Sequence, residues 1–138
     1  MKKLLFIIWM LPLFVSGQEN THNISGRIVL KARTGDVYVM LTDRDQFKVS
    51  FSGIDTTIIK TNYDKTSVDF EFKDVPQGEY AISCFQDVNQ NGKLDRWPWG
   101  PREPWGYTWN GELKFPPSFD QVSFYLVDDL RINIILGK

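Results

Sequence analysis

A chain of 138 residues is long enough for one folded domain and too short for two full-sized cores. Hydrophobic residues make up 42% of it and charged residues 24%, which excludes a disordered or collagen-like protein. The formal net charge of −1 excludes the basic surface that nucleic-acid binding requires, and the single cysteine excludes a scaffold of intrachain disulfides.

Residues 1–17 have the pattern of a signal peptide. Lys2 and Lys3 precede an apolar run at 4–15, and Val15-Ser16-Gly17 offers the small residues of a cleavage site. The apolar run, about 12 residues, is too short for a membrane-spanning helix, which needs about 20. No cysteine adjoins the site, so no lipoprotein anchor is expected. The sequence predicts an exported protein, periplasmic or extracellular, whose mature part (18–138) is one domain without a transmembrane segment.

Alternation of apolar and polar residues predicts strands along most of the mature chain. In chain order, they are expected at 24–31, 37–41, 47–51, 57–60, 67–73, 80–85, 121–126 and 130–136. No window shows a sustained helical period. This series predicts an all-β fold, an antiparallel β-sandwich of immunoglobulin-like or transthyretin-like type, with a small closed barrel as the alternative.

Cys84 lies in the apolar run at 80–85, which reads as a central strand. A free exposed thiol is a liability in an oxidising compartment, so we expect this thiol to be buried. The chain has one histidine, His22, near the mature N-terminus, and offers no basic partner for a nucleophilic thiolate. Cys84 is therefore predicted to be a core residue.

Residues 87–119 break the strand pattern and hold five of the seven prolines and four of the five tryptophans. A long irregular segment of this kind inside a compact domain is usually functional. We therefore expect one long Pro/Trp-rich loop that carries the function.

The loop opens with a sequence similar to the first nine positions of a calcium-binding loop. Counting residue 87 as position 1, oxygen-bearing side chains fall at positions 1, 3, 5 and 9, and a glycine at position 6 permits the sharp bend. The predicted ligands are the side chains of Asp87, Asn89, Asn91 and Asp95 and the carbonyl of Lys93. These predict weak, structural binding of Ca²⁺. The alternative is an Asx-rich turn that caps its own backbone without metal.

The twelfth position of this loop, where an EF-hand places a bidentate Glu, is Pro98. Our candidate for the missing acidic ligand is Glu103, because Gly100 and Pro101 allow the chain to fold back toward the loop.

The same segment is dense in aromatic residues, namely Trp97, Trp99, Trp105, Tyr107 and Trp109. If exposed, they form a platform for sugar rings or peptide; if buried, they form a small core of the loop. Aromatic residues in Pro-rich loops more often pack than bind, so we expect most of them to be buried.

Successive motifs of the chain resemble those of one bacterial family. They are the segments 78–80 (GEY), 85–95 (FQDVNQNGKLD), 100–107 (GPREPWGY) and 116–120 (PPSFD). The family is the uncharacterised exported family called domain of unknown function 2141, and the similarity covers residues 24–137. The resemblance implies a small exported β-sandwich from a Gram-negative bacterium. The sequence departs from the family pattern at Gln86, where His is common, and in the bulkier segment 96–99.

Two classes of function follow from these features. The first is a non-catalytic binding or structural module of the bacterial envelope, in which calcium stiffens the loop. Its partner would be an envelope protein or a glycan. A more specific version of this hypothesis is carbohydrate binding through the Trp-rich loop. The second is a glycan hydrolase that uses Asp95 and Glu103 as paired carboxylates. The sequence offers no nucleophile elbow, histidine cluster or histidine base, so we favour the non-catalytic module.

Overall fold

The structure is a computed structural model that describes residues 19–48, 53–61, 64–109 and 114–137. The predicted signal peptide lies outside the described residues, as do residues 49–51 of the strand expected at 47–51.

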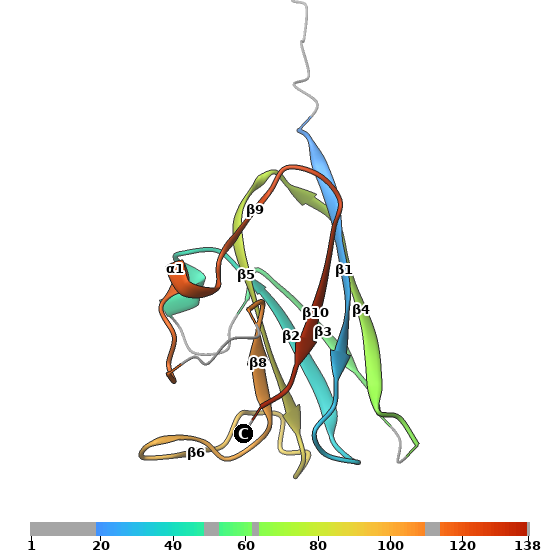
Figure 1. The fold of residues 1–138 in the computed structure, drawn as a ribbon, viewed down its shortest axis with the longest axis vertical. Coiled ribbons are helices and arrows are strands. Elements are labelled where there is room, and N and C mark those ends of the chain that lie inside the picture. The colour runs from blue at the N-terminus through green and yellow to red at the C-terminus, as the bar shows by residue number, and fades with distance from the viewer. Residues whose placement is uncertain (1–18, 49–52, 62–63, 110–113, 138) are drawn as a thin grey trace, which may run out of the picture.

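Strands dominate the fold (Figure 1). In chain order the elements are β1 (Thr21–Val29), β2 (Asp36–Thr42), the 3-10 helix η1 (Gln46–Lys48), β3 (Asp55–Ile59), β4 (Ser67–Pro76), β5 (Gly78–Asp87), β6 (Arg96–Trp97), β7 (Gly100–Pro101), β8 (Trp105–Tyr107), α1 (Phe119–Val122), β9 (Phe124–Leu126) and β10 (Leu130–Ile135).

Two sheets pack against each other. One has the order β10-β1-β4 and the other the order β3-β2-β5-β8, with β9 paired to the beginning of β5. The predicted all-β sandwich is confirmed, with one departure from an antiparallel pattern: β10 runs parallel to β1, with Ile24 opposite Leu130 and Val29 opposite Ile135. Short β6 and β7 form a separate hairpin (Figure 1).

The inward-facing side chains of the two sheets form the main core. Phe72 and Ile24 come from one sheet, and Val39 and Ile82 from the other. Cys84 is fully buried among them, as predicted, and this burial raises the pKa of its thiol well above the ordinary value. The period-two alternation in the sequence is therefore the pattern that fills this core.

Two predicted strands are wrong in part, because local hydrogen bonds override their alternation. Asp43 accepts bonds from the backbone of Gln46 and Phe47, which begins η1 where a strand was expected. The strand expected at 121–126 begins at Phe124, because the backbone N–H of Ser118 donates to Oε1 of Gln121 (2.9 Å) and caps α1.

Buried Gln86 ties β5 to the β1–β2 connection. Its Oε1 accepts from the backbone N–H of Ala32 (3.0 Å), and its Nε2 donates to the carbonyls of Ala32 (2.9 Å) and Thr34 (3.0 Å). All polar atoms of this buried amide are thus satisfied by backbone groups, which is the usual condition for burying one.

Across the described ranges, no helix is long and apolar enough to cross a membrane.

The Gln86→Ala variant is expected to lower the free energy of unfolding by about 1–3 kcal/mol, because it leaves three partly buried backbone groups of Ala32 and Thr34 without these partners. Urea unfolding followed by circular dichroism measures this loss. Gln77→Ala, at an exposed position, is the matched control and should change stability by less than about 0.5 kcal/mol. Equal stability of the two variants would contradict the assigned role of Gln86.

Candidate functional site

The acidic loop leaves the end of β5 and wraps around the side chain of Asp87. This side chain is 1% exposed. Its Oδ1 accepts from the N–H of Asn91 (3.1 Å) and its Oδ2 from the N–H of Gly92 (2.7 Å). Gly92 has a φ of 78°, the left-handed conformation that glycine adopts readily, so the chain can turn back here. Asp87 therefore organises the bend that the sequence predicted at the glycine.

The amide side chains of the loop continue this pattern. Oδ1 of Asn89 accepts from the N–H of Asn91 (3.2 Å), and Oδ1 of Asn91 accepts from the N–H of Lys93 (3.1 Å). Both amides also donate to Oδ2 of Asp95, at 2.6 and 3.0 Å, and these bonds lower the pKa of Asp95 below its ordinary value. The structure thus brings four of the predicted ligands into one hydrogen-bonded loop.

Glu103 folds back onto the loop. Its side chain is 6% exposed, and its Oε1 accepts from the N–H groups of Val88 (2.9 Å) and Asn89 (3.5 Å). Its Oε2 accepts from the N–H of Asp95 (3.2 Å). The carboxylate thereby joins the two ends of the loop. In this position its oxygens face backbone donors inside the loop rather than an open surface where a substrate would lie.

Neither Asp87 nor Glu103 forms an ion pair in the described part of the chain. Buried charges are normally paired or coordinate a metal. Two buried carboxylates in one loop, neither with an ion-pair partner, are therefore unusual. Within the same residues, no group of three or more His, Cys, Asp or Glu side chains is placed to hold a metal ion. A cation here would need amide and carbonyl oxygens as well as carboxylates.

The aromatic residues of the segment divide into two sets. Trp97, Trp99 and Trp109 are 48%, 79% and 66% exposed. The expectation that most aromatic residues here are buried is therefore wrong. The β6–β7 hairpin lies outside both sheets and offers Trp97 and Trp99 no core to enter (Figure 1).

The β6–β7 hairpin carries two tryptophan rings that stack on each other. Trp97 and Trp99 stack with centroids 5.7 Å apart and planes 3° apart, and the guanidinium of Arg102 lies 4.4 Å from the Trp97 centroid. The stack holds the rings in fixed orientations while Trp99 stays largely in solvent.

The second set, on β8, packs against the sheet. Tyr107 is buried, which raises the pKa of its phenol to about 12. Trp105 is half-buried and meets Tyr107 and Phe115 edge to face, at 5.6 and 5.1 Å. These two residues of the predicted ligand surface are structural.

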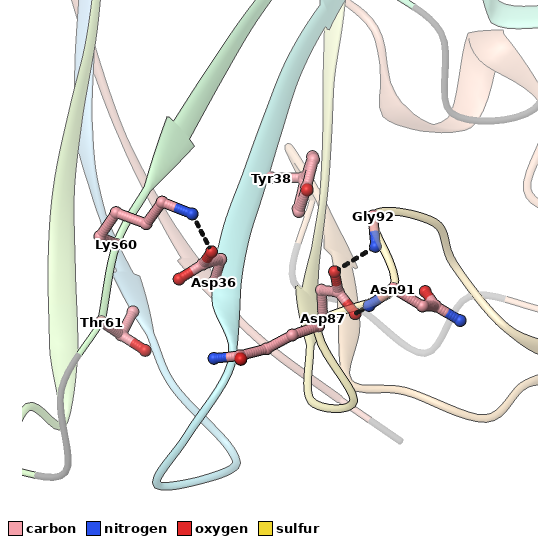
Figure 2. Close-up of a pocket in the computed structure, with 8 residues that line it drawn as sticks. Asp36, Tyr38, Lys60, Thr61, Asp87, Asn91 and Gly92 are labelled. Atoms are coloured by element: carbon pink, nitrogen blue, oxygen red, sulfur yellow. Dashed lines mark hydrogen bonds and ion pairs between the residues drawn. The ribbon is translucent and has the colours of Figure 1, made fainter.

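A polar groove that the sequence reading missed lies beside the acidic loop (Figure 2). Its volume is about 570 Å³, and it runs from Lys60 and Thr61 across Asp36 and Tyr38 of β2 to the loop at 87–92. Alternation along β2 could have revealed it, because Val37 and Val39 enter the core and leave residues 36 and 38 on the outer face.

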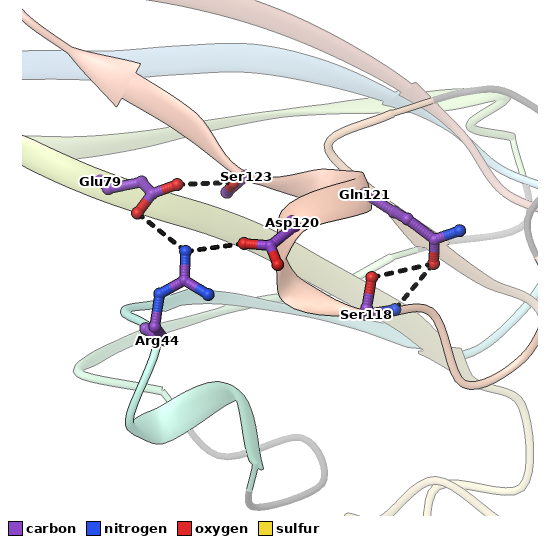
Figure 3. A network of polar contacts seen from close by, with 6 residues as sticks. All are labelled: Arg44, Glu79, Ser118, Asp120, Gln121 and Ser123. Carbon is purple, nitrogen blue, oxygen red and sulfur yellow. Dashed lines mark hydrogen bonds and ion pairs between the residues drawn. The ribbon is translucent and has the colours of Figure 1, made fainter.

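A second polar cluster, near α1, is structural (Figure 3). Nη2 of Arg44 donates to Oε2 of Glu79 (3.2 Å) and to Oδ1 of Asp120 (2.7 Å), and Oγ of Ser123 donates to Oε1 of Glu79 (2.9 Å). The guanidinium also covers the ring of Phe119 at 4.7 Å. This network fastens α1 to the sheet.

The comparison with family models agrees with the family resemblance of the motifs at 78–80, 85–95, 100–107 and 116–120. Residues 28–133 match the model of the family described as "Uncharacterized protein conserved in bacteria (DUF2141)", and the chain belongs to that family. No curated protein and no solved structure matched the chain.

Glu103→Gln is expected to destabilise the protein by about 1–3 kcal/mol even in chelator, because the new amide group would face backbone donors that the carboxylate now satisfies. Chemical unfolding in the presence of EDTA measures this effect. Glu71→Gln, on the exposed side of β4, is the control and should leave stability nearly unchanged. A Glu103→Gln variant as stable as the parent would show that the carboxylate does not hold the loop.

Proposed function

We propose that the protein is an exported, non-catalytic module of the bacterial envelope whose loop at 87–103 binds calcium. The observation that carries the proposal is the pair of buried carboxylates, Asp87 and Glu103, that lack an ion-pair partner in the described residues. A divalent cation would supply the missing positive charge.

The proposed ligands retain free lone pairs. An ionised carboxylate has about four acceptor sites. Asp87 uses two of them for the N–H groups of the loop, and Glu103 uses three. The side-chain oxygens of Asn89 and Asn91 each accept one hydrogen bond, which leaves a second lone pair on each.

The full proposed ligand set is Asp87, Asn89, Asn91, the Lys93 carbonyl, Asp95 and Glu103. Oxygen atoms of these kinds are the ligands that Ca²⁺ prefers. The role assigned to the ion is structural, because it would fix the segment that leads from β5 to the tryptophan hairpin.

The signal-peptide pattern at 1–17 supports export, and the weak binding expected of such a loop suits a compartment with millimolar calcium. The burial of Glu103 among backbone donors supports a non-catalytic role over hydrolysis by Asp95 and Glu103.

Calcium at ten times its Kd is expected to stabilise the protein by about 1.4 kcal/mol, which raises Tm by several degrees. Thermal melts in calcium and in EDTA measure the shift. Asp87→Ala and Asp95→Ala should each abolish it, whereas Asp69→Ala, whose carboxylate pairs with Arg27 on the outer face, should keep it. Identical melts in both buffers, with no heat of binding at millimolar calcium, would overturn the proposal.

A second candidate function is carbohydrate binding by the β6–β7 hairpin. The exposed, parallel rings of Trp97 and Trp99 favour it, because a rigid aromatic surface can stack on a sugar ring at little entropic cost.

If the hairpin binds glycans, soluble peptidoglycan fragments or maltohexaose should change the intrinsic tryptophan fluorescence. Trp99→Ala is expected to weaken that binding at least tenfold, about 1.4 kcal/mol. Trp109→Ala is the matched control, because Trp109 is also largely exposed (66% against 79% for Trp99) but borders a hollow beside β10. A silent fluorescence titration and a silent glycan array would leave a protein as the partner of this surface.

A further inference from the structure

The groove beside Tyr38 has a size and a lining that suit a small ligand. Its volume of about 570 Å³ lies within the range of small-molecule sites. The groove lies on the outer face of the β3-β2-β5 sheet (Figure 2) and is therefore a separate site from the β6–β7 hairpin.

One wall of the groove is a fixed aromatic ring. Tyr38 stands between Ile58 of β3 and Phe85 of β5 in the sheet register. Its ring stacks on that of Phe85, with centroids 4.8 Å apart and planes 8° apart. The opposite face of the Tyr38 ring is on the side of Ile58, where no aromatic ring of the described residues stacks on it.

The rest of the lining consists of groups that recognise hydroxyls. Nζ of Lys60 donates to Oδ2 of Asp36 at 2.5 Å, and both groups keep sites for further hydrogen bonds. The hydroxyl of Thr61 donates to the carbonyl of Gly35 at 2.6 Å and so presents its lone pairs as acceptors. The side-chain amide of Gln90 makes no hydrogen bond to any residue that the structure describes, and Gln90 lines the groove.

The backbone at Gln90 is unusual for this kind of residue. Its φ of 59° lies in the left-handed region, which a residue with a side chain adopts at a steric cost. A glycine would form the same turn without that cost, so the strained geometry is consistent with a role for the side chain.

We propose that this groove binds a neutral sugar unit. The C–H face of the sugar ring lies against the Tyr38 ring, and its hydroxyls contact the Asp36–Lys60 pair and the side-chain amide of Gln90. A neutral ligand fits the charge better than a uronic acid, because Asp36 and Asp87 face a single lining cation, Lys60.

The groove shares the wall at 87–92 with the loop proposed to bind calcium, yet it does not depend on the ion. The hydrogen bonds of Asp87 to Asn91 and Gly92 already hold that wall. Binding experiments in calcium and in EDTA therefore separate the two proposals.

Isothermal titration calorimetry with cellotetraose, maltotetraose, chitotetraose and trigalacturonate tests the inference. At least one neutral tetrasaccharide should bind, and more tightly than the acidic probe. Tyr38→Ala is expected to weaken binding at least tenfold, and Gln90→Ala and Lys60→Ala at least threefold. Tyr38→Phe keeps the ring and should retain most of the affinity, which guards against a folding defect in Tyr38→Ala.

Two controls locate the site. Tyr125→Ala removes a tyrosine that is 72% exposed on β9, and it should not change binding. Trp99→Ala separates the two proposed sugar sites, because Trp99 does not line the groove. Loss of binding in Trp99→Ala with retention in Tyr38→Ala would transfer the site to the hairpin and overturn the proposal, as would tighter binding of trigalacturonate or no binding of any neutral probe. Sugar binding that persists while calcium has no effect on Tm would support the groove and reject the calcium site.

Discussion

Two carboxylates inside the protein, those of Asp87 and Glu103, determine how the segment after β5 is built. A buried carboxylate must find hydrogen-bond donors, and the backbone of the loop supplies five contacts to these two groups. The chain bends at Gly92 because Asp87 draws the surrounding N–H groups inward. Glu103 closes the loop from the other end, so the β6–β7 hairpin between them leaves from a fixed base.

This construction gives the proposed activities a common origin. The hairpin holds Trp97 and Trp99 outside the core, and the same loop forms one wall of the groove beside Tyr38. An ion bound at the loop would fix the base of the hairpin, whereas the groove wall at 87–92 is already held by the hydrogen bonds of Asp87. In the module we propose, the sandwich positions the loop, and the loop in turn positions the recognition groups of the hairpin and of the groove.

Much of the fold and of the acidic loop could be predicted from the sequence, and the predictions that were wrong failed for physical reasons. Alternation predicted the strands that fill the core, because burial on one face imposes a period of two. It said nothing about partners, so the parallel pairing of β1 with β10 was invisible. Phe47 begins an alternation of apolar and polar residues, yet Asp43 turns the chain into η1. The spacing of Asp87, Asn89 and Asn91 predicted the sharp loop, whereas the exposure of Trp99 depended on a hairpin that no periodicity marks. The groove escaped notice because its residues come from β2, from the two positions after β3 and from the loop, which are distant in sequence.

The parallel pairing of β1 with β10 sets the order of events when the protein is made. β1 lies between β4 and β10, so one of its edges stays unpaired until the last strand of the chain has emerged from the ribosome. Strand contacts of such long sequence separation form slowly, and an unpaired edge can meet the edge of another molecule. A nascent chain of this design gains from being kept unfolded until it is complete. A chain truncated before β10 (Leu130–Ile135) would thus keep this edge of β1 open to other molecules.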